Sequence, residues 1–309
     1  MNAYYSFNDY LKQRFGEKIY KLSLSCAKTC PNRDGTVGSR GCIFCSAQGS
    51  GDFATCADMP VDLQIELAKT RLQKKCRCRR FIAYFQSFSS TYVSPDILKE
   101  ALDSAVRRDD IAALSLATRP DCLGNDILEI LQQTANKKPL MVELGLQSTN
   151  PATVRYIRRG YDHAIYKDAV LRLHKIGAHV VTHMILGLPG ETPDIMLHTV
   201  DDIVNAGSDG IKLQLLHVLS GTDLAADFEK GNFNLPTMEE YIAILAEIIE
   251  HLPPDMVIHR LTGDGPKKLL IAPQWSADKK RVLNAITQYF REHDIHQGRK
   301  YTKKRSAEM

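Results

Sequence analysis

The chain has 309 residues, of which 44% are hydrophobic and 25% charged, with a formal net charge of +4. This composition is that of an ordinary globular protein that buries a core. It contains no run of 18 apolar residues that could span a membrane, and its first 16 residues lack the basic and apolar segments of a signal peptide. We therefore expect a cytoplasmic protein that makes no membrane contact.

Short apolar segments rich in β-forming residues alternate with longer amphipathic segments along the first 250 residues. Strands are predicted at 18–24, 80–88, 111–118, 139–148, 179–189 and 210–218. Helices are predicted at 62–75, 95–107 and 126–136, within 153–176, and after residue 191. Apolar strands that alternate with helices predict a parallel sheet covered by helices.

Six strand–helix units are too few for a closed eight-stranded barrel, so the predicted α/β fold is a partial (β/α)6 barrel. After about residue 250 the pattern changes to a strand-and-turn segment at 251–265 and one more helix at 276–293. We interpret this part as a small α+β C-terminal extension. The predicted domains are therefore the barrel with its N-terminal cysteine loop, 1–250, and the extension with a basic tail, 251–309.

Polar side chains recur at the predicted carboxyl ends of the strands. Because these ends meet at one edge of a parallel sheet, where sites in such folds form, we regard them as candidate site residues. They are Gln86, Ser87, Thr118, Arg119, Glu143, Gln147, His183 and His217. On the fourth strand Glu143, Gly145 and Gln147 share one face. Buried polar groups there need either a ligand or an internal polar network.

Seven of the eight cysteines precede residue 80, and this uneven distribution indicates a metal centre more than disulfides. Cys42 and Cys45 are separated by two residues, and Cys30 lies upstream. Three cysteines suit an iron–sulfur cluster that leaves one iron open to another ligand. With Cys26 as a fourth ligand, they would also suit zinc. Spacing alone leaves both alternatives open, together with plain buried thiols.

Basic residues are concentrated at 74–80 and 298–305, with shorter runs at 266–268 and 279–281. Clustered lysine and arginine suit a phosphate backbone, although such runs are also common on solvated helix faces and in chain ends.

The segment CPNRDGTVGSRGCIFC resembles the cluster loop of the radical S-adenosylmethionine (SAM) enzymes, in the YhcC/YtqA-type branch related to the catalytic subunit of Elongator. Further segments follow in the order of that family: AYFQSFSSTY, ATRPDCL, VELGLQS, IRRGYDH, THMILGLPGE, GIKLQLLHVLSGT and HRLTGDG. The segment GSGDFA resembles the YtqA side of the branch. The resemblance covers about 250 residues.

The resemblance implies a 4Fe-4S cluster held by Cys30, Cys42 and Cys45, with SAM on the fourth iron and Cys26 not a ligand. Reductive cleavage of SAM would give a 5′-deoxyadenosyl radical that takes a hydrogen atom from the substrate. We consider Cys122 as a hydrogen-atom or proton donor near the radical, against a buried structural cysteine.

The resemblance also implies the residues that contact SAM. Gln86 and Ser87 stand where many relatives carry a Gly-Gly-Glu motif, which is absent here. Arg159 is predicted to pair with the methionine carboxylate, and Leu188 lies in the segment that resembles the adenine side. The remaining predicted cofactor contacts are Thr118, Arg119, Glu143, Gly145, Gln147 and His183.

The function implied by the resemblance is conversion of 5-carboxymethylaminomethyluridine to 5-aminomethyluridine at the tRNA wobble position. The expected partners are tRNA, an electron donor and a downstream tRNA methyltransferase. The predicted RNA-binding residues are Lys267, Lys268, Arg299, Lys300, Lys303, Lys304 and Arg305. The alternatives are a radical SAM enzyme acting on a small metabolite or a protein, and a non-catalytic, zinc-stabilised RNA-binding module.

Overall fold

Seven parallel strands form one curled sheet in the computed structural model, which describes residues 3–49, 51–73, 78–263 and 265–302. The order across the sheet is β1-β2-β3-β4-β5-β6-β8, so neighbours in space largely follow the order of the chain. The strands are β1 (Tyr20–Leu24), β2 (Phe81–Phe85), β3 (Ile111–Thr118), β4 (Leu140–Gln147), β5 (His179–Leu186), β6 (Gly210–Leu215) and β8 (Val257–Arg260). Two short strands, β7 (Val218–Leu219) and β9 (Leu270–Ala272), pair antiparallel beside it.

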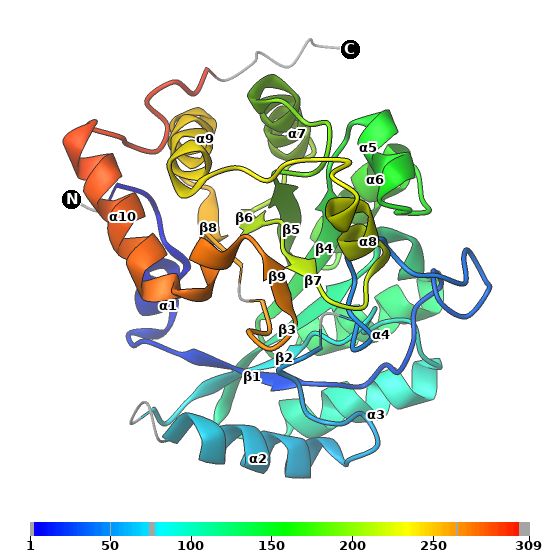
Figure 1. The fold of residues 1–309 in the computed structure, drawn as a ribbon. Helices are drawn as coiled ribbons and strands as arrows, with labels where there is room; N and C mark the ends of the chain where they lie inside the picture. The colour runs from blue at the N-terminus through cyan, green and yellow to red at the C-terminus, as the bar shows by residue number, and fades with distance from the viewer. Residues whose placement is uncertain (1–2, 50, 74–77, 264, 303–309) are drawn as a thin grey trace, which may run out of the picture.

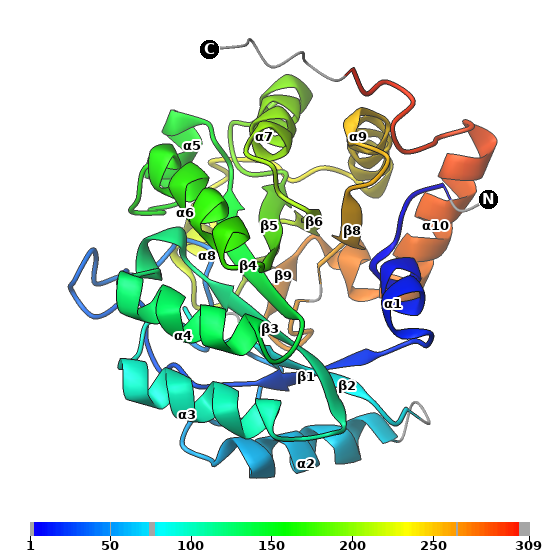
Figure 2. The same ribbon diagram turned by 180° about the vertical axis from the view of Figure 1, so that it is seen from behind.

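Helices surround this sheet, and most of them cover its outer, convex face (Figures 1 and 2). They are α1 (Phe7–Phe15), α2 (Val61–Gln73), α3 (Pro95–Val106), α4 (Asn125–Ala135), α5 (Pro151–Tyr156), α6 (His163–Lys175), α7 (Pro193–Asn205), α8 (Asp223–Glu229), α9 (Met238–His251) and α10 (Lys279–Glu292). The arrangement is a parallel half-barrel, which confirms the predicted fold class. None of the described helices is long and apolar enough to cross a membrane.

All six predicted strands are present, and β3 has the predicted bounds. The segment predicted as one strand at 210–218 instead contains two, β6 and β7, with Leu216 and His217 between them. Strand β8 comes from the segment beyond residue 250 and pairs in parallel with β6, so part of the expected extension completes the sheet. The division into domains at residue 250 stays a prediction.

Three helices were not predicted: α1, α8 and α9. Their end signals are nevertheless present in the sequence. Helix α9 begins with a capping box, in which Thr237 and Glu240 satisfy each other's backbone N–H groups. Helix α1 begins at the N-cap Ser6 and ends at Gly16, whose φ of 76° is readily adopted by glycine.

Two small apolar cores close the ends of the half-barrel, in addition to the main core between sheet and helices. At the amino ends of the strands, Leu11 of α1 packs with Ile19, Ile82, Ala113 and Met141. We call this group the floor plug. At the carboxyl ends a second group brings together Ile43, Ile157, Ile185, Leu188, Leu216, Val218, Leu224, Ala225 and Ala272, and we call it the upper core.

Candidate functional site

The cysteine loop, residues 30–46, is anchored at the carboxyl ends of the strands. The side chain of Ile43 is buried in the upper core, its N–H donates to the carbonyl of Ile157 (3.2 Å), and its carbonyl accepts from the N–H of Leu224 (3.0 Å). Gly160 makes a close approach to the loop, because a Cβ there would lie 2.7 Å from Asn32 Oδ1 and 2.6 Å from a methyl group of Val37. The loop is therefore held at the edge where the candidate site residues end.

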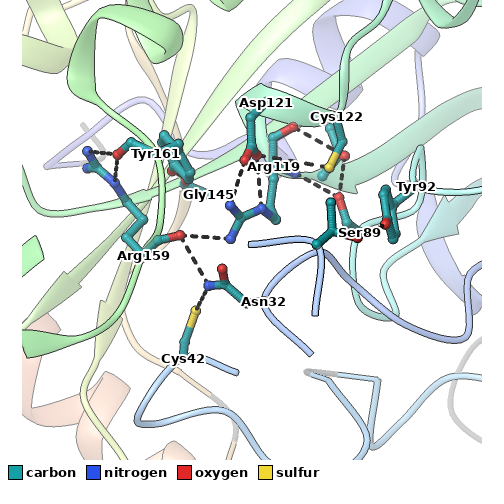
Figure 3. Close-up of polar contacts among 12 residues, drawn as sticks. Asn32, Cys42, Ser89, Tyr92, Arg119, Asp121, Cys122, Gly145, Arg159 and Tyr161 are labelled. Carbon is teal, nitrogen blue, oxygen red and sulfur yellow. Dashed lines mark hydrogen bonds and ion pairs between the residues drawn. The ribbon is translucent and has the colours of Figure 1, made fainter. Parts of the chain in front are cut away.

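Two side chains within the loop organise its cysteines. The amide of Asn32 donates to Cys42 Sγ (3.4 Å) and to the carbonyl oxygens of Arg158 (2.7 Å) and Arg159 (3.1 Å), as Figure 3 shows in part. The guanidinium of Arg33 donates to the carbonyls of Cys45 (3.2 Å) and Ser46 (2.5 Å). Neither residue was among the predicted site residues, although both lie between Cys30 and Cys42.

The three loop thiols lie near enough to influence one another. Burial, and then the neighbouring Cys45, raise the pKa of Cys42 to about 11, and burial and Cys45 also raise the pKa of Cys30. The positive charge of Arg119 lowers the pKa of both Cys30 and Cys42. Within the described part of the chain, no three His, Cys, Asp or Glu side chains are grouped closely enough to hold a metal ion. The thiols therefore share one loop without forming a closed ligand set.

The donor set nevertheless fits an iron–sulfur cluster with three protein ligands. The loop presents three thiols together with an amide N–H directed at one sulfur, which is the kind of hydrogen bond that tunes such clusters. Cys26 is directed elsewhere, because its buried thiol donates to the carbonyl of Ser90 (3.2 Å). Burial raises the pKa of Cys26 to about 12, which disfavours the thiolate that a metal ligand requires.

Hydroxyl groups gather where β2 and β3 end, beside the loop. Thr118 Oγ1 shares hydrogen bonds with Ser89 (2.8 Å) and Thr91 (2.5 Å), and Ser87 pairs with Ser25. Ser90 is fully buried, yet its Oγ has no partner. At the end of β5, Oε2 of Glu191 is likewise buried without a partner. Unpartnered buried polar atoms at this edge fit a polar ligand such as SAM.

Arg159, the predicted partner of the methionine carboxylate, donates hydrogen bonds to main-chain carbonyls. Its guanidinium donates to the carbonyls of Tyr161, Leu146 and Ser148, and the residue is only 2% exposed. Arg119 pairs with Asp121 (2.6 Å) and donates to the carbonyl of Arg159 (2.8 Å; Figure 3). In this structure four of the five N–H groups of Arg159 therefore brace the loop after β4, and its pairing with the methionine carboxylate stays a prediction.

Backbone strain is concentrated around the loop. Phe88, Gln147 and Arg158 are non-glycine residues with φ of 52°, 65° and 57°. The register of β4 against β5 shifts between Gly145 and Gln147, so Gln147 leaves the regular alternation of the strand. Such conformations persist when the surrounding structure determines them, and they cluster at functional sites.

Below the loop, six side chains that face the inside of the half-barrel form a buried ionic layer, one from each of β1 to β6. They are Lys21, Tyr84, Ser115, Glu143, His183 and Lys212. The carboxylate of Glu143, which is 0% exposed, lies at the centre. Lys21 and Ser115 (2.7 Å) donate to its Oε1. Tyr84 (3.0 Å), His183 (2.8 Å) and Lys212 donate to its Oε2.

The layer maintains a charged glutamate beside a neutral histidine. Burial alone would raise the pKa of Glu143, but Lys21 and Lys212 hold that pKa well below its ordinary value. Burial, and then Lys212, lower the pKa of His183 to about 4. A neutral imidazole that donates through Nε2 to Glu143 can accept at Nδ1, where the amide of Gln214 lies 3.3 Å away.

Glu143 thus takes part in an internal polar network, whereas the predicted cofactor contacts of the fourth strand stay a prediction. His183 belongs to the same network. Lys21 and Lys212 were missed by the sequence analysis, although a lysine inside an otherwise apolar strand, as in KIYKLSL and GIKLQLL, is the signal that could have found them.

Other predicted residues lie as follows. Gln86 directly follows β2 and is half-buried, whereas the side chain of Leu188 is buried in the upper core. Cys122 is buried near the hydroxyl cluster, and burial raises the pKa of its thiol to about 12 (Figure 3). His217 lies against Gly263 and Gly265, where a Cβ would approach its ring to 2.7 Å and 3.2 Å.

The predicted RNA-binding residues do not form one surface. Lys267 and Lys268 are exposed on the segment that joins β8 to β9, near the carboxyl ends of the strands. Arg299 (3.6 Å) and Lys300 (2.8 Å) pair with Glu250 near the end of α9, and this end leads into the start of β8, at the opposite edge of the sheet. Lys303, Lys304 and Arg305 lie outside the described residues.

One hollow of the fold lies away from the loop. A cavity of about 460 Å³ is lined by residues from the starts of β4 and β5, among them Leu140, Met141 and His179, and by Tyr10 and Arg14 of α1. It opens at the amino ends of the strands, whereas parallel α/β proteins place their sites at the carboxyl ends. The loop edge therefore remains the candidate site.

Comparison with known proteins gives matches over most of the chain. Residues 32–203 match the model of the Radical SAM superfamily, and residues 208–292 match the Radical_SAM C-terminal domain. The chain is 39% identical over 296 residues to the uncharacterized protein YtqA of Bacillus subtilis, covering 96% of this chain and 92% of that protein. It is 26% identical over 162 residues to a tRNA uridine(34) acetyltransferase of Dehalococcoides mccartyi, covering 52% of this chain and 35% of that protein.

Among solved structures, the fold resembles the archaeal Methanocaldococcus infernus Elp3 with an N-terminal deletion. The TM-score is 0.66 at 18% sequence identity, and the match covers 78% of this chain and 61% of the other. At this identity the likeness concerns the fold alone.

Replacing Glu143 with Gln should destabilise the protein by about 3–5 kcal/mol, because Lys21 and Lys212 would lose their buried counter-charge. Urea unfolding measures the free energy. Glu247, whose partly exposed carboxylate pairs with Lys300, offers the control: Glu247→Gln should cost no more than about 1 kcal/mol. Equal losses of unfolding free energy in Glu143→Gln and Glu247→Gln would contradict the central role of Glu143.

Replacing Cys30, Cys42 or Cys45 singly with Ala should abolish iron–sulfur absorbance and iron content after anaerobic reconstitution. Cys26→Ala is the matched control, and it should retain both because its thiol is directed at Ser90. Circular dichroism checks that each variant is folded. Loss of iron from Cys26→Ala to the same extent as from the loop variants would show that the ligand set is misassigned.

Proposed function

Because the chain belongs to the Radical SAM superfamily, we propose that it modifies the tRNA wobble uridine, converting 5-carboxymethylaminomethyluridine to 5-aminomethyluridine. The observation that carries the proposal is the three-cysteine loop anchored at the carboxyl edge of the half-barrel, above a polar interior. This is the edge at which a bound substrate base and the reactive group can meet.

The residues of the chain prepare the site for its cofactors. Cys30, Cys42 and Cys45 would hold the cluster, with Asn32 stabilising charge on Cys42 through its N–H. Ser90 and Glu191 supply unpartnered polar atoms for SAM. When bound, the 4Fe-4S cluster and SAM supply a 5′-deoxyadenosyl radical that takes a hydrogen atom from the substrate.

The proposed conversion begins at the CH₂ of the carboxymethyl group. Loss of a hydrogen atom there, followed by transfer of one electron to the oxidised form of the electron donor and of one proton to solvent, gives an imine. Addition of water breaks the carbon–nitrogen bond, releases glyoxylate and leaves the aminomethyl group. The free amine is then a substrate for a tRNA methyltransferase, which we propose as the next enzyme. An electron donor must reduce the cluster in each cycle.

Two features support tRNA over a small metabolite or a protein. Over about half of its length the chain matches an enzyme named for tRNA uridine 34. Lys267 and Lys268 are exposed near the carboxyl edge, where they can contact phosphates while a flipped base enters the interior. Membership of an enzyme superfamily leaves the non-catalytic zinc module without support.

Deleting the gene should change the wobble-uridine profile of cellular tRNA, with the carboxymethylaminomethyl nucleoside accumulating and its aminomethyl descendants disappearing. Mass spectrometry of tRNA nucleosides measures both, and complementation with the wild-type gene should restore the profile. Complementation with Cys42→Ala should not restore it. An unchanged profile in the deletion strain would reject tRNA in favour of another substrate.

Replacing both Lys267 and Lys268 with Glu should weaken tRNA binding about tenfold at 0.1 M salt. It should also reduce the slope of log K against log salt by about 2, because two phosphate contacts are lost. The control is Arg299→Ala with Lys300→Ala, whose charges are already paired at the far edge. A larger loss of tRNA affinity in the control than in the Lys267/Lys268 variant would place the RNA at the amino edge of the sheet.

A further inference from the structure

Small side chains line part of the inner face of the half-barrel above the ionic layer. Along each strand, the next residue that faces inward lies one step closer to the loop. On four strands these residues are Ser23, Ala117, Gly145 and Gln214, and all four are half-buried. Three of them are small. In the layer itself, Lys21 and His183 keep 19% and 16% of their side chains exposed.

The ionic layer contains two amines for a single carboxylate, and it carries excess positive charge when both amines are protonated. Two ammonium groups, from Lys21 and Lys212, share the single carboxylate of Glu143, while His183 is neutral. The positive charge of Arg260 also acts on both lysines. Burying charge in excess of its partners costs free energy, and a layer that served only the fold could have used one lysine for one glutamate.

The ammonium groups also keep unused hydrogen-bond donors. Glu143 already accepts five hydrogen bonds, which exhausts the roughly four lone-pair sites of a carboxylate. Lys212 donates to Glu143 and to the hydroxyl of Tyr84 (3.1 Å). Lys21 donates to Glu143 and lies over the rings of Tyr84 and Phe7. Each ammonium has three N–H groups, so donors remain for an anion.

We propose that Lys21 and Lys212 bind the carboxylate of the substrate on the inner face of the half-barrel. This proposal rests on the proposed function, since the carboxymethylaminomethyl side chain ends in a carboxylate. A carboxylate held there directs the adjacent CH₂ toward the carboxyl edge of the strands, where the cysteine loop lies. The two lysines are thus specificity-determining residues that select an acidic uridine side chain over a neutral one.

The electrostatics of Lys212 agree with this role. Burial, and then Lys21 and Arg260, act against the attraction of Glu143 and lower the pKa of Lys212 to about 7. A second carboxylate would restore the balance of charge and favour the ammonium form.

The test compares two anticodon stem-loop RNAs that differ at the wobble uridine, one with the carboxymethylaminomethyl group and one with its neutral carboxamide. Reconstituted wild-type enzyme should bind the carboxylate RNA about 30-fold more tightly, measured by fluorescence anisotropy without reductant. In Lys212→Met and in Lys21→Met this preference should fall to about twofold, because the carboxylate RNA loses affinity and the carboxamide RNA does not.

Ser115→Ala is the matched control, because it removes a hydrogen bond to Glu143 without removing a charge. It should keep the preference for the carboxylate. A general structural effect of the lysine variants would weaken binding of both RNAs equally and leave their ratio unchanged, and that result would overturn the proposal. Iron content and thermal stability are measured for every variant.

Turnover of the two RNAs separates this inference from the proposed function. If the wild-type enzyme cleaves SAM and prefers the carboxylate RNA but converts neither RNA, the proposed reaction is wrong while the carboxylate site stands. If it binds both RNAs equally, the carboxylate site is wrong whether or not either RNA is converted.

Discussion

One buried carboxylate connects the strands of this half-barrel. Glu143 accepts hydrogen bonds from side chains of β1, β2, β3, β5 and β6, so a single group on β4 links six of the seven parallel strands on their inner face. An open sheet has no closing strand to determine its curvature, and inward-facing contacts of this kind can do so. The floor plug on one side and the upper core on the other then define how deep the interior is.

The cysteine loop depends on this frame without being part of the sheet. It is held by an apolar side chain, two main-chain hydrogen bonds and a glycine contact, all at positions outside the cysteines themselves. The thiols are therefore positioned by contacts between the protein's own residues. This division resembles that of other enzymes in which a rigid sheet carries a functional loop at its carboxyl edge.

The strands could be predicted from the sequence because their apolar runs are nearly continuous, and the cysteine loop could be found from its spacing and its family resemblance. The roles of Arg159 and Glu143 could not. Arg159 donates to three carbonyls of β4 and the segment that follows it, and Glu143 accepts from side chains up to 122 residues away. Neither set of partners leaves a local pattern. A strand was expected in the segment that contains β8, but its pairing with β6 depends on tertiary contacts that the short segment does not encode by its own periodicity.

The burial of Ile43 in the upper core has a consequence for modularity. This residue lies between Cys42 and Cys45, yet it packs in the same core as Ala272, with β7, β9 and α8 around it. The region that matches the C-terminal family model thus supplies part of the apolar core that anchors the cysteine loop. A hybrid protein that combines the N-terminal region of one relative with the C-terminal region of another would therefore have to preserve the packing around Ile43. Substitutions at this side chain and at its neighbours in the upper core are expected to be coupled.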